Sequence, residues 1–179
     1  MDIQHRHETL FFCPGEYKRP DIHLDIYEIR DVTTKRRMWE IFRKYHYLNT
    51  ELHSAAVQYV GVMDGELVAH TGIIPFPMHK GVRRVHRFVV LPDYQGIGIG
   101  MKFIDKVAQM IRERGERLNL TTTTPALKHA LIKDPRWSLA RYGRAELNRK
   151  SAKEAQYVSG IAASSSMNRV TYSFYYEPK

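Results

Sequence analysis

Cysteine and long apolar runs are what this sequence has least of. Its one cysteine, Cys13, cannot form an internal disulfide, and we expect an inert thiol in a reducing setting rather than a nucleophile. No apolar run approaches the roughly 18 to 20 residues that a membrane span needs, which argues against an integral helical membrane protein. The opening residues, MDIQHRH, lack the apolar region of a signal peptide, so we expect a cytoplasmic protein.

Acidic residues and metal-binding motifs are also scarce. Aspartate and glutamate total 19 against 28 lysines and arginines, which gives a net charge of +9 and a pI near 9.7. This balance suits a polyanionic partner such as nucleic acid, and it equally suits a phosphorylated cofactor or an ordinary basic surface. The nine histidines show no HExxH or HxH spacing beyond His5-x-His7, so we predict no metal site.

Apolar periodicity divides the chain into strands and helices, within what we expect to be one domain over residues 1–179. Asp31 begins a run of helix-start residues, Asp64-Gly65 is a hairpin signal, and Gly115 suits the end of a helix. We expect a loose segment at 1–20 and a mobile loop at 148–167. Strands are expected at 21–30, 56–63, 66–75, 82–91, 118–123 and 169–177, and helices at 31–45, 101–114 and 125–132.

The most informative segment is residues 89–100, VVLPDYQGIGIG, in which strand residues precede a glycine-rich turn and a helix. Such a turn binds anions, because glycines let backbone N–H groups approach a phosphate and the helix dipole favours negative charge. The spacing does not fit two better-known phosphate loops. A P-loop needs Gly-Lys-Ser/Thr where this chain has Gly100-Met101-Lys102, and a Rossmann turn needs G-x-G-x-x-G.

The segment resembles the acyl-coenzyme A loop, Q/R-x-x-G-x-G/A, of the GNAT N-acetyltransferase superfamily. Gln95, Gly98 and Gly100 match it, a V-x-P sequence precedes it, and the element order agrees over residues 22–176. The resemblance implies an α/β fold with a mixed, mostly antiparallel sheet flanked by helices. It implies transfer of an acyl group from acetyl-coenzyme A, or another acyl-coenzyme A, to an amine. It also implies cofactor-binding backbone groups, with Val89 and Val90 for the pantetheine arm and Gln95, Gly96, Ile97, Gly98, Ile99 and Gly100 for the pyrophosphate.

Acyl transfer to an amine can use a base for the amine, a donor for the carbonyl oxygen and an acid for the thiolate. GNAT enzymes often place the base on the strand before the glycine loop or on its neighbour, where this chain has His86. His86 is therefore a candidate base near neutral pH, and the alternative is that it faces solvent and has no catalytic role. Many relatives carry a tyrosine acid on the short helix after the fifth strand, where Leu131 stands here. His129 is the substitute we expect, with an exposed, inactive histidine as the alternative.

The sequence Tyr45-His46-Tyr47 ends the first expected helix, where GNAT enzymes usually form the wall on the acceptor side. With Trp39, these tyrosines could form an aromatic platform for a flat base or an amine. His46 and Tyr47 are therefore candidate catalytic residues. Core packing is the alternative for Trp39 and Tyr45.

The tract after the short helix is basic and contains a tryptophan. Arg136, Trp137, Arg141 and Arg144 could follow a nucleic-acid backbone and stack on a base, with a solvated face as the alternative. Together with the tyrosine–histidine motif, this tract is loosely similar to the bacteriophage Mom-type DNA-modification proteins, which are GNAT-like. On that resemblance the acceptor is a nucleobase in DNA or RNA. A third alternative is a module that binds coenzyme A or nucleic acid without turnover.

Overall fold

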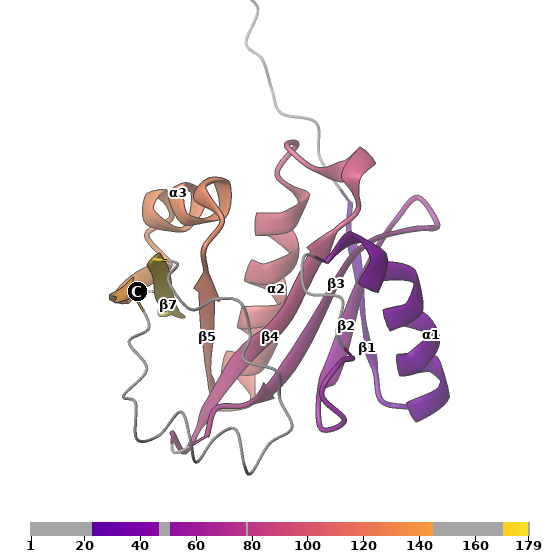
Figure 1. Ribbon diagram of the computed structural model, residues 1–179, viewed down its shortest axis with the longest axis horizontal. Coiled ribbons are helices and arrows are strands. Elements are labelled where there is room, and N and C mark those ends of the chain that lie inside the picture. Colours follow the sequence, from indigo (N-terminus) through magenta and orange to yellow (C-terminus); the bar gives the residue numbers. More distant parts are fainter. Residues whose placement is uncertain (1–22, 47–50, 78, 145–169, 179) are drawn as a thin grey trace, which may run out of the picture.

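The computed structural model describes residues 23–46, 51–77, 79–144 and 170–178, which form one seven-stranded sheet with three α-helices (Figure 1). The segments expected to be loose or mobile, 1–20 and 148–167, lie outside the described residues. No helix in the described part of the chain is long and apolar enough to cross a membrane. In chain order the elements are β1 (Asp25–Ile29), α1 (Val32–Phe42), η1 (Arg43–Tyr45), β2 (Val57–Met63), β3 (Glu66–Pro75), β4 (Val82–Val90), η2 (Pro92–Tyr94), α2 (Ile99–Glu113), β5 (Arg117–Thr122), α3 (Pro125–Lys133), β6 (Trp137–Arg144) and β7 (Val170–Tyr176).

The sheet has the strand order β1-β2-β3-β4-β5-β7-β6. Every neighbouring pair is antiparallel except β4 and β5, which run parallel. The expected α/β fold with a mixed, mostly antiparallel sheet is therefore confirmed. The expected strands and helices agree with the observed ones to within a few residues, apart from β6.

Local sequence explains where several elements begin and turn. Asp64 and Gly65 have φ values of 51° and 83°, as a tight two-residue turn between β2 and β3 requires. The Asp31 carboxylate accepts a 2.7 Å hydrogen bond from the backbone N–H of Thr34 and so caps α1. Gly115, with φ of 78°, closes the last turn of α2 through its own N–H. The expected hairpin, helix start and helix end are thus confirmed.

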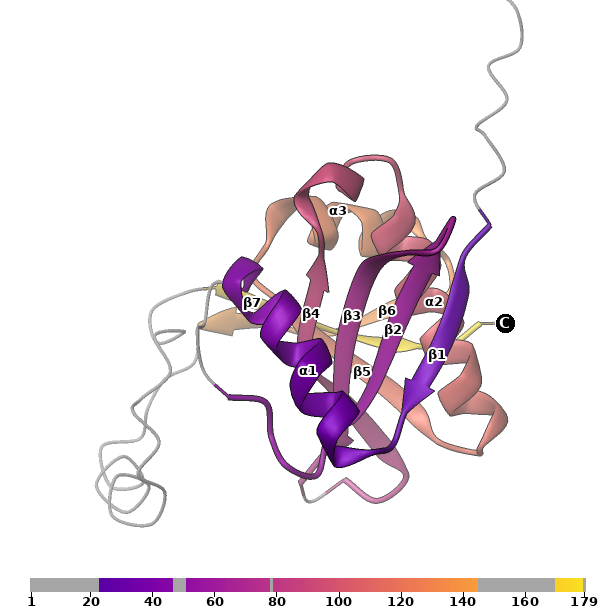
Figure 2. The same cartoon turned by 90° about the vertical axis from the view of Figure 1, so that its right-hand side faces the viewer.

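Helices cover both faces of the sheet, with α1 on one face and α2 on the other (Figure 2). The apolar stripe of α2, which includes Phe103 and Val107, is buried in the larger core. Trp39 and Phe42 of α1 form a smaller cluster with Val89 of β4. β4 contributes Val85 to the larger cluster and Val89 to the smaller one, so it packs on both faces of the sheet.

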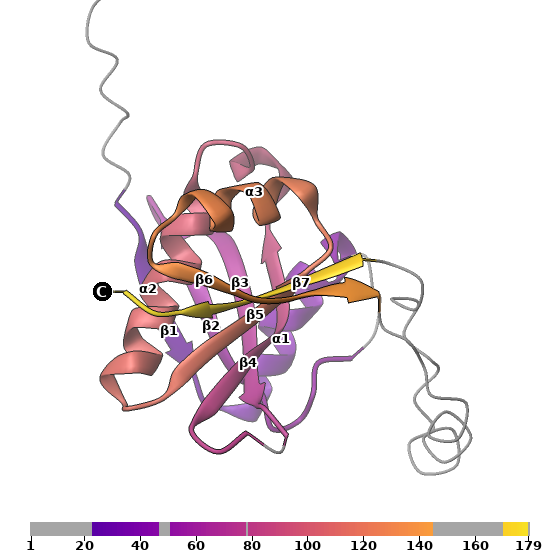
Figure 3. The same cartoon turned by 90° about the vertical axis from the view of Figure 1, so that its left-hand side faces the viewer.

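β6 is an element that the sequence pattern does not reveal. The basic tract that we expected at the surface pairs antiparallel with β7 and ends the sheet (Figure 3). Trp137 is only 5% exposed, and its indole N–H donates a 2.7 Å hydrogen bond to the carboxylate of Asp105 on α2. The expectation that Trp137 stacks on a nucleic-acid base is therefore wrong, because the ring joins β6 to the core.

Candidate active site

β4 is irregular at His86. The register between β3 and β4 shifts between Gly72 and Ile73, and His86 is the extra residue on β4, which makes it a β-bulge. The parallel pairing of β4 with β5 ends close by, at Arg84↔Asn119, and the two strands then diverge (Figure 1). The second half of β4 therefore has a strand partner on one side only.

The backbone of β4 beyond the bulge carries polar groups that the sheet does not use. The Leu91 N–H donates to the Val68 carbonyl at 2.9 Å, so by antiparallel alternation Val89 also faces β3. Phe88 and Val90 direct their backbone groups to the opposite edge. The pairing therefore distinguishes the two residues expected to bind the pantetheine arm, Val89 and Val90. The backbone of Val89 belongs to the sheet, and Phe88 joins Val90 at the edge without a strand partner.

The glycine loop follows β4 and leads into α2. The Gln95 side-chain amide donates to the Val90 carbonyl at 2.8 Å, which folds the loop back over the end of β4. Gly96 and Gly98 have φ values of 84° and 95°, a left-handed conformation that favours glycine, and both are exposed. The first N–H groups of an α-helix have no intrahelical acceptor, so the loop presents donors and the positive end of the α2 dipole to solvent.

The third glycine lies where α2 and β4 pack closely. A Cβ atom on Gly100 would lie 3.2 Å from Cγ2 of Val90 and 3.5 Å from Cζ of Phe88, so a larger residue here would require Val90 to move by a few tenths of an ångström. Ile99 is fully buried in the larger core, whereas Ile97 is exposed. Among the expected phosphate-binding residues, Ile99 therefore has only its backbone to offer.

Histidines from three segments gather beside the bulge, on the α1 face. The ring of His53 lies 6.1 Å from that of His86, edge to face, and the ring of His46 lies 6.0 Å from that of Trp39. Burial, followed by the charges of Arg87 and of the neighbouring histidines, lowers the pKa of His86 to about 4. His86 is therefore a neutral imidazole near neutral pH and has a lone pair for a proton.

His53 was not among the expected site residues, because no motif surrounds it. The backbone N–H of Ala55 donates to Nδ1 of His53 at 3.1 Å, so the neutral ring carries its hydrogen on Nε2. Only the fold, which places this segment over β3 and β4, brings His53 close to His86.

A fourth histidine, His70 of β3, is fully buried beneath α1 and was also missed. Its ring lies 5.5 Å from that of Trp39 and 5.2 Å from that of Phe42, and its Nε2 lies 3.0 Å from Oε1 of Gln58. Burial lowers the pKa of His70 to about 3, so the ring is neutral in the folded protein. Among the described residues, nothing bonds to its Nδ1 atom.

The other expected site residues have separate outcomes. Tyr47 lies outside the described residues. Core packing is confirmed for Trp39, which is 3% exposed, and is wrong for Tyr45, which is 45% exposed. His129 is exposed on α3, beyond β5 and away from α1 (Figure 1), and Leu131, in register with the family's tyrosine, is fully buried.

A family model described as the acetyltransferase (GNAT) family matches residues 22–131, which is more than half of the chain. The chain belongs to the GNAT acetyltransferase family. It is therefore an acetyltransferase, and acyl-coenzyme A is its cofactor. A comparison with curated proteins gave no match.

Solved structures of low sequence identity share the fold of this GNAT acetyltransferase. The IAA acetyltransferase from Bacillus cereus ATCC 14579 is 14% identical, with a TM-score of 0.61 over 87% of this chain and 100% of that chain. The ribosomal-protein-S18-alanine N-acetyltransferase from Escherichia coli is 13% identical, with a TM-score of 0.59 over 86% of this chain and 93% of that chain. A Bacillus subtilis acetyltransferase in complex with CoA is 11% identical, with a TM-score of 0.62 over 88% of this chain and 100% of that chain. At these identities the likeness establishes the fold.

The GNAT acetyltransferase has a groove of about 560 Å³ between α1 and residues 51–54. Trp39, Leu52 and Gln58 line it together with charged residues of α1, and His53 connects its wall to the bulge of β4. A second hollow, of about 490 Å³, is lined by residues within 75–83 and by Glu116. That hollow lies at the end of β4 that still pairs with β5, so it is remote from the glycine loop.

The expected nucleic-acid surface is only partly present. Arg136 is held by two carboxylates, with Nη2 2.5 Å from Asp134 Oδ2 and 2.5 Å from Asp105 Oδ2. Arg141 and Arg144 are exposed on β6. Within the described residues, no His, Cys, Asp and Glu side chains are grouped so that three could hold a metal ion.

Proposed function

We propose that this enzyme transfers an acyl group from acyl-coenzyme A to an amine that enters through the groove between α1 and residues 51–54. The bulge of β4 is the observation that carries the proposal, because two sets of functional groups adjoin it. The backbone of Phe88 and Val90 and the glycine loop lie on one side of it. His86 is the bulged residue itself, and His53 of the groove wall lies 6.1 Å away, ring to ring.

The donor side fits the cofactor through backbone groups. Acyl-coenzyme A supplies an activated thioester and carries a pyrophosphate. We assign the pyrophosphate to the N–H groups of residues 95–100, where left-handed glycines and the α2 dipole favour an anion. The N–H groups of Phe88 and Val90, which have no strand partner, are the donors for the carbonyl oxygen and the pantetheine arm. A fixed donor of this kind stabilises the negative charge that develops on the oxygen.

The acceptor side must accept a proton, because an amine attacks only in its neutral form and becomes strongly acidic as the C–N bond forms. We assign this role to His86, which is neutral near neutral pH. A pKa of about 4 makes His86 a weak base, so it suits the acidic proton released during bond formation better than a proton on a free ammonium ion. His46 and His53 lie beside it and are the candidates to carry the proton onward.

The acid for the leaving thiolate is assigned to His129. The position of the tyrosine that many relatives use is taken by Leu131, which is buried and has no proton to give. His129 lies two positions earlier on α3, on the opposite side of β4 from the histidine cluster, and is exposed. The base and the acid would then approach the thioester from opposite sides.

A small amine has more support as the acceptor than a nucleobase. Trp137 is buried and Arg136 is bonded to two carboxylates, so neither is available to a nucleic acid. A groove of about 560 Å³ is within the range of small-molecule sites. No described contact favours the Mom-type alternative or a module without turnover.

Two linked measurements test this function. Acetyl-coenzyme A should raise the melting temperature, because a ligand at 100 times its Kd adds about 2.7 kcal/mol to stability. Release of the free thiol with a panel of small amines then measures transfer. His86→Gln should lower kcat by about 10²- to 10⁴-fold and leave the binding of acetyl-coenzyme A unchanged. No shift of the melting temperature at millimolar acetyl-coenzyme A would overturn the proposed donor site. An unchanged rate of transfer in His86→Gln would overturn the role of His86.

A further inference from the structure

We propose that the acceptor of this enzyme is a small amine that also carries an anionic group, and that Lys35 and Arg36 bind this group. The inference rests on the proposed function, because it concerns the acceptor groove. It adds the chemical class of the substrate, which neither the fold nor the family specifies.

One face of α1 forms a complete wall of the groove. The lining residues of the helix and of the η1 turn that follows it are spaced by three and four positions, which is the spacing of a single helical face. From the start of α1 onward they are Val32, Lys35, Arg36, Trp39, Glu40 and Arg43. Positive charge is therefore concentrated near the first turns of the wall, and the buried indole of Trp39 is part of it.

Ion pairing leaves the charges of this wall unequally compensated. Arg43 at the end of the wall is paired with Glu51 of the opposite wall, Nη1 to Oε1 at 3.3 Å, so these two charges offset each other. Among the described residues, no ion pair is found for Lys35 or Arg36. Glu40 also has no ion pair among the described residues. The uncompensated charges of the groove are therefore the two positive charges of Lys35 and Arg36 and the one negative charge of Glu40. A free carboxylate or phosphate on the ligand would compensate this excess.

The geometry also assigns the two ends of the ligand. The Arg43–Glu51 pair ties the walls together at the C-terminal end of α1, and residues 52–54 continue along the groove from there. His53 of this wall leads to His86 and the thioester side. The reactive amine then faces His53 on this wall and the neighbouring His86, and the anionic group faces Lys35 and Arg36 on the α1 wall across the groove. Glu40, between Arg36 and Arg43 on the α1 wall, can attract the ammonium form of the amine before it loses its proton.

The size of the groove favours a small ligand. About 560 Å³ accommodates an amino acid, an amino sugar phosphate or a short phosphoamine, and a macromolecule would have to present one such group at the end of a narrow segment. Carboxylate and phosphate share the chemistry that two adjacent cations recognise. Separate substrate pairs can therefore distinguish between them.

The first experiment measures transfer to matched amines. Thiol release from acetyl-coenzyme A is followed with glycine against glycinamide, and with phosphoethanolamine against ethanolamine, each rate corrected for the fraction of neutral amine. At low salt, kcat/KM should be at least about tenfold higher for the anionic member of one pair, and added salt should reduce the ratio. The pair with the larger ratio identifies carboxylate or phosphate as the recognised group.

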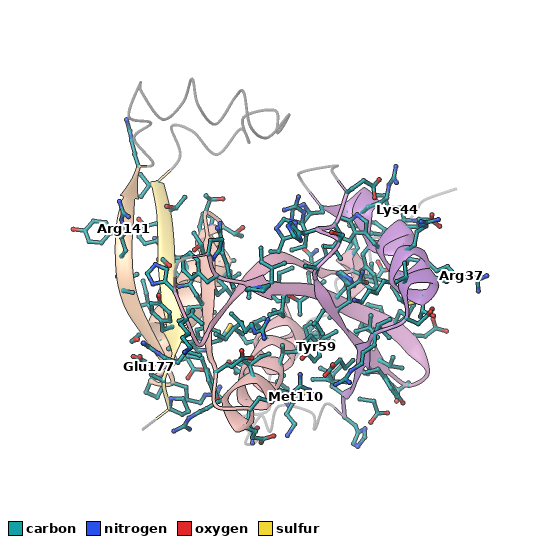
Figure 4. The ribbon with its side chains drawn as sticks, turned by 90° about the horizontal axis from the view of Figure 1, so that it is seen from below. Arg37, Lys44, Tyr59, Met110, Arg141 and Glu177 are labelled. Atoms are coloured by element: carbon teal, nitrogen blue, oxygen red, sulfur yellow. The ribbon has the colours of Figure 1, made fainter. Side chains whose placement is uncertain are left out.

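The variants for this experiment are chosen from one helix. Lys35→Gln and Arg36→Gln should each reduce the anionic-to-neutral ratio about tenfold, with the KM for acetyl-coenzyme A unchanged. Arg37→Gln is the matched control, since Arg37 is exposed, does not line the groove and points away from the body of the protein (Figure 4). Equal rates within both pairs, or equal effects of Arg36→Gln and Arg37→Gln, would overturn the proposal.

A binding measurement separates this proposal from the acyl-transfer function. In the protein saturated with coenzyme A, inorganic phosphate should shift the backbone amide resonances of residues 32–40 and 51–54, and the double variant K35Q/R36Q should abolish these shifts. Phosphate binding in the groove without transfer to any amine would support the anion site and contradict the proposed function. Transfer to amines without resonance shifts in the groove, and without a higher rate for the anionic amines, would support the acyl-transfer function and contradict the anion site.

Discussion

The imidazole rings of His53 and His86 lie 6.1 Å apart and meet edge to face, although 32 residues separate them in the sequence. His53 belongs to the wall of the acceptor groove, and His86 is the bulged residue of the strand that precedes the glycine loop. This contact is where the two halves of the proposed site meet. It also places two titratable rings together, which has consequences that can be measured.

His86 should titrate far below an ordinary histidine. Its pKa of about 4 has burial as its largest cause, followed by the charges of Arg87 and His53. The chemical shift of the His86 Cε1 proton, followed by NMR against pH, should therefore show a midpoint well below 6.5. His53→Gln should raise this midpoint, because one neighbour of like charge is lost, and should leave it below 6.5, because burial persists. A wild-type midpoint near 6.5 would contradict the environment described for His86.

Gly98→Ala should weaken binding of coenzyme A. Gly98 has φ of 95°, so an alanine there strains the loop by about 1 kcal/mol and displaces the N–H groups that we assign to the pyrophosphate. Gly65→Ala is a matched control, because Gly65 has a similar φ of 83° and, like Gly98, open space around its Cβ position. Isothermal titration should show a several-fold increase in Kd for Gly98→Ala only. An equal Kd for coenzyme A in both variants would show that the loop does not bind the cofactor.

The features that sequence predicts well are those set by neighbours in the chain. The glycine loop, the Asp64-Gly65 turn and the Asp31 cap depend on local backbone conformation, so residue types within a few positions are sufficient to identify them. The fold follows from these signals, since the order of elements and the loop together match one family.

The features that sequence does not reveal depend on distant packing. His70 is a polar residue within β3, and the placement of α1 over that strand buries its ring against Trp39 and Phe42. His53 has no motif, because its partner His86 is on another strand. The basic residues around Trp137 are typical of a surface tract, and only the fold brings the buried carboxylate of Asp105, on a separate helix, to accept its N–H. In each case the deciding neighbour lies more than fifteen residues away.

Asp105→Ala should destabilise the fold strongly. Its carboxylate accepts hydrogen bonds from Trp137 Nε1 at 2.7 Å and from Arg136 Nη2 at 2.5 Å, so the alanine leaves a buried indole N–H unpaired and removes the link between α2 and β6. We expect a loss of about 2 to 4 kcal/mol in the free energy of unfolding, measured by urea denaturation. Asp93→Ala, an exposed aspartate of η2, should change stability by less than about 0.5 kcal/mol. A loss below about 1 kcal/mol for Asp105→Ala would show that β6 is held by its pairing with β7 alone.

His70 should make the protein labile to mild acid. Its pKa is about 3 in the folded state and near 6.5 when exposed, so between these values the unfolded chain binds a proton that the folded chain does not. Stability is therefore complete above about pH 6.5 and falls as the pH is lowered, by up to about 1.4 kcal/mol per pH unit for this residue. His86 also lowers the stability as the pH falls, over the narrower range from about pH 6.5 down to its own pKa of about 4.

His70→Gln isolates this contribution, since a glutamine can still donate to Gln58 and does not titrate. The comparison is between slopes, because the substitution also changes packing against Trp39 and Phe42. The free energy of unfolding should decline less steeply between about pH 7 and 5 in the variant than in the wild type, by up to about 1.4 kcal/mol per pH unit. His23→Gln, in which the replaced side chain is 88% exposed, should keep the wild-type slope. Identical slopes in all three proteins would mean that His70 is hydrated or protonated in the folded state, and that the cluster beneath α1 is more open than its packing indicates.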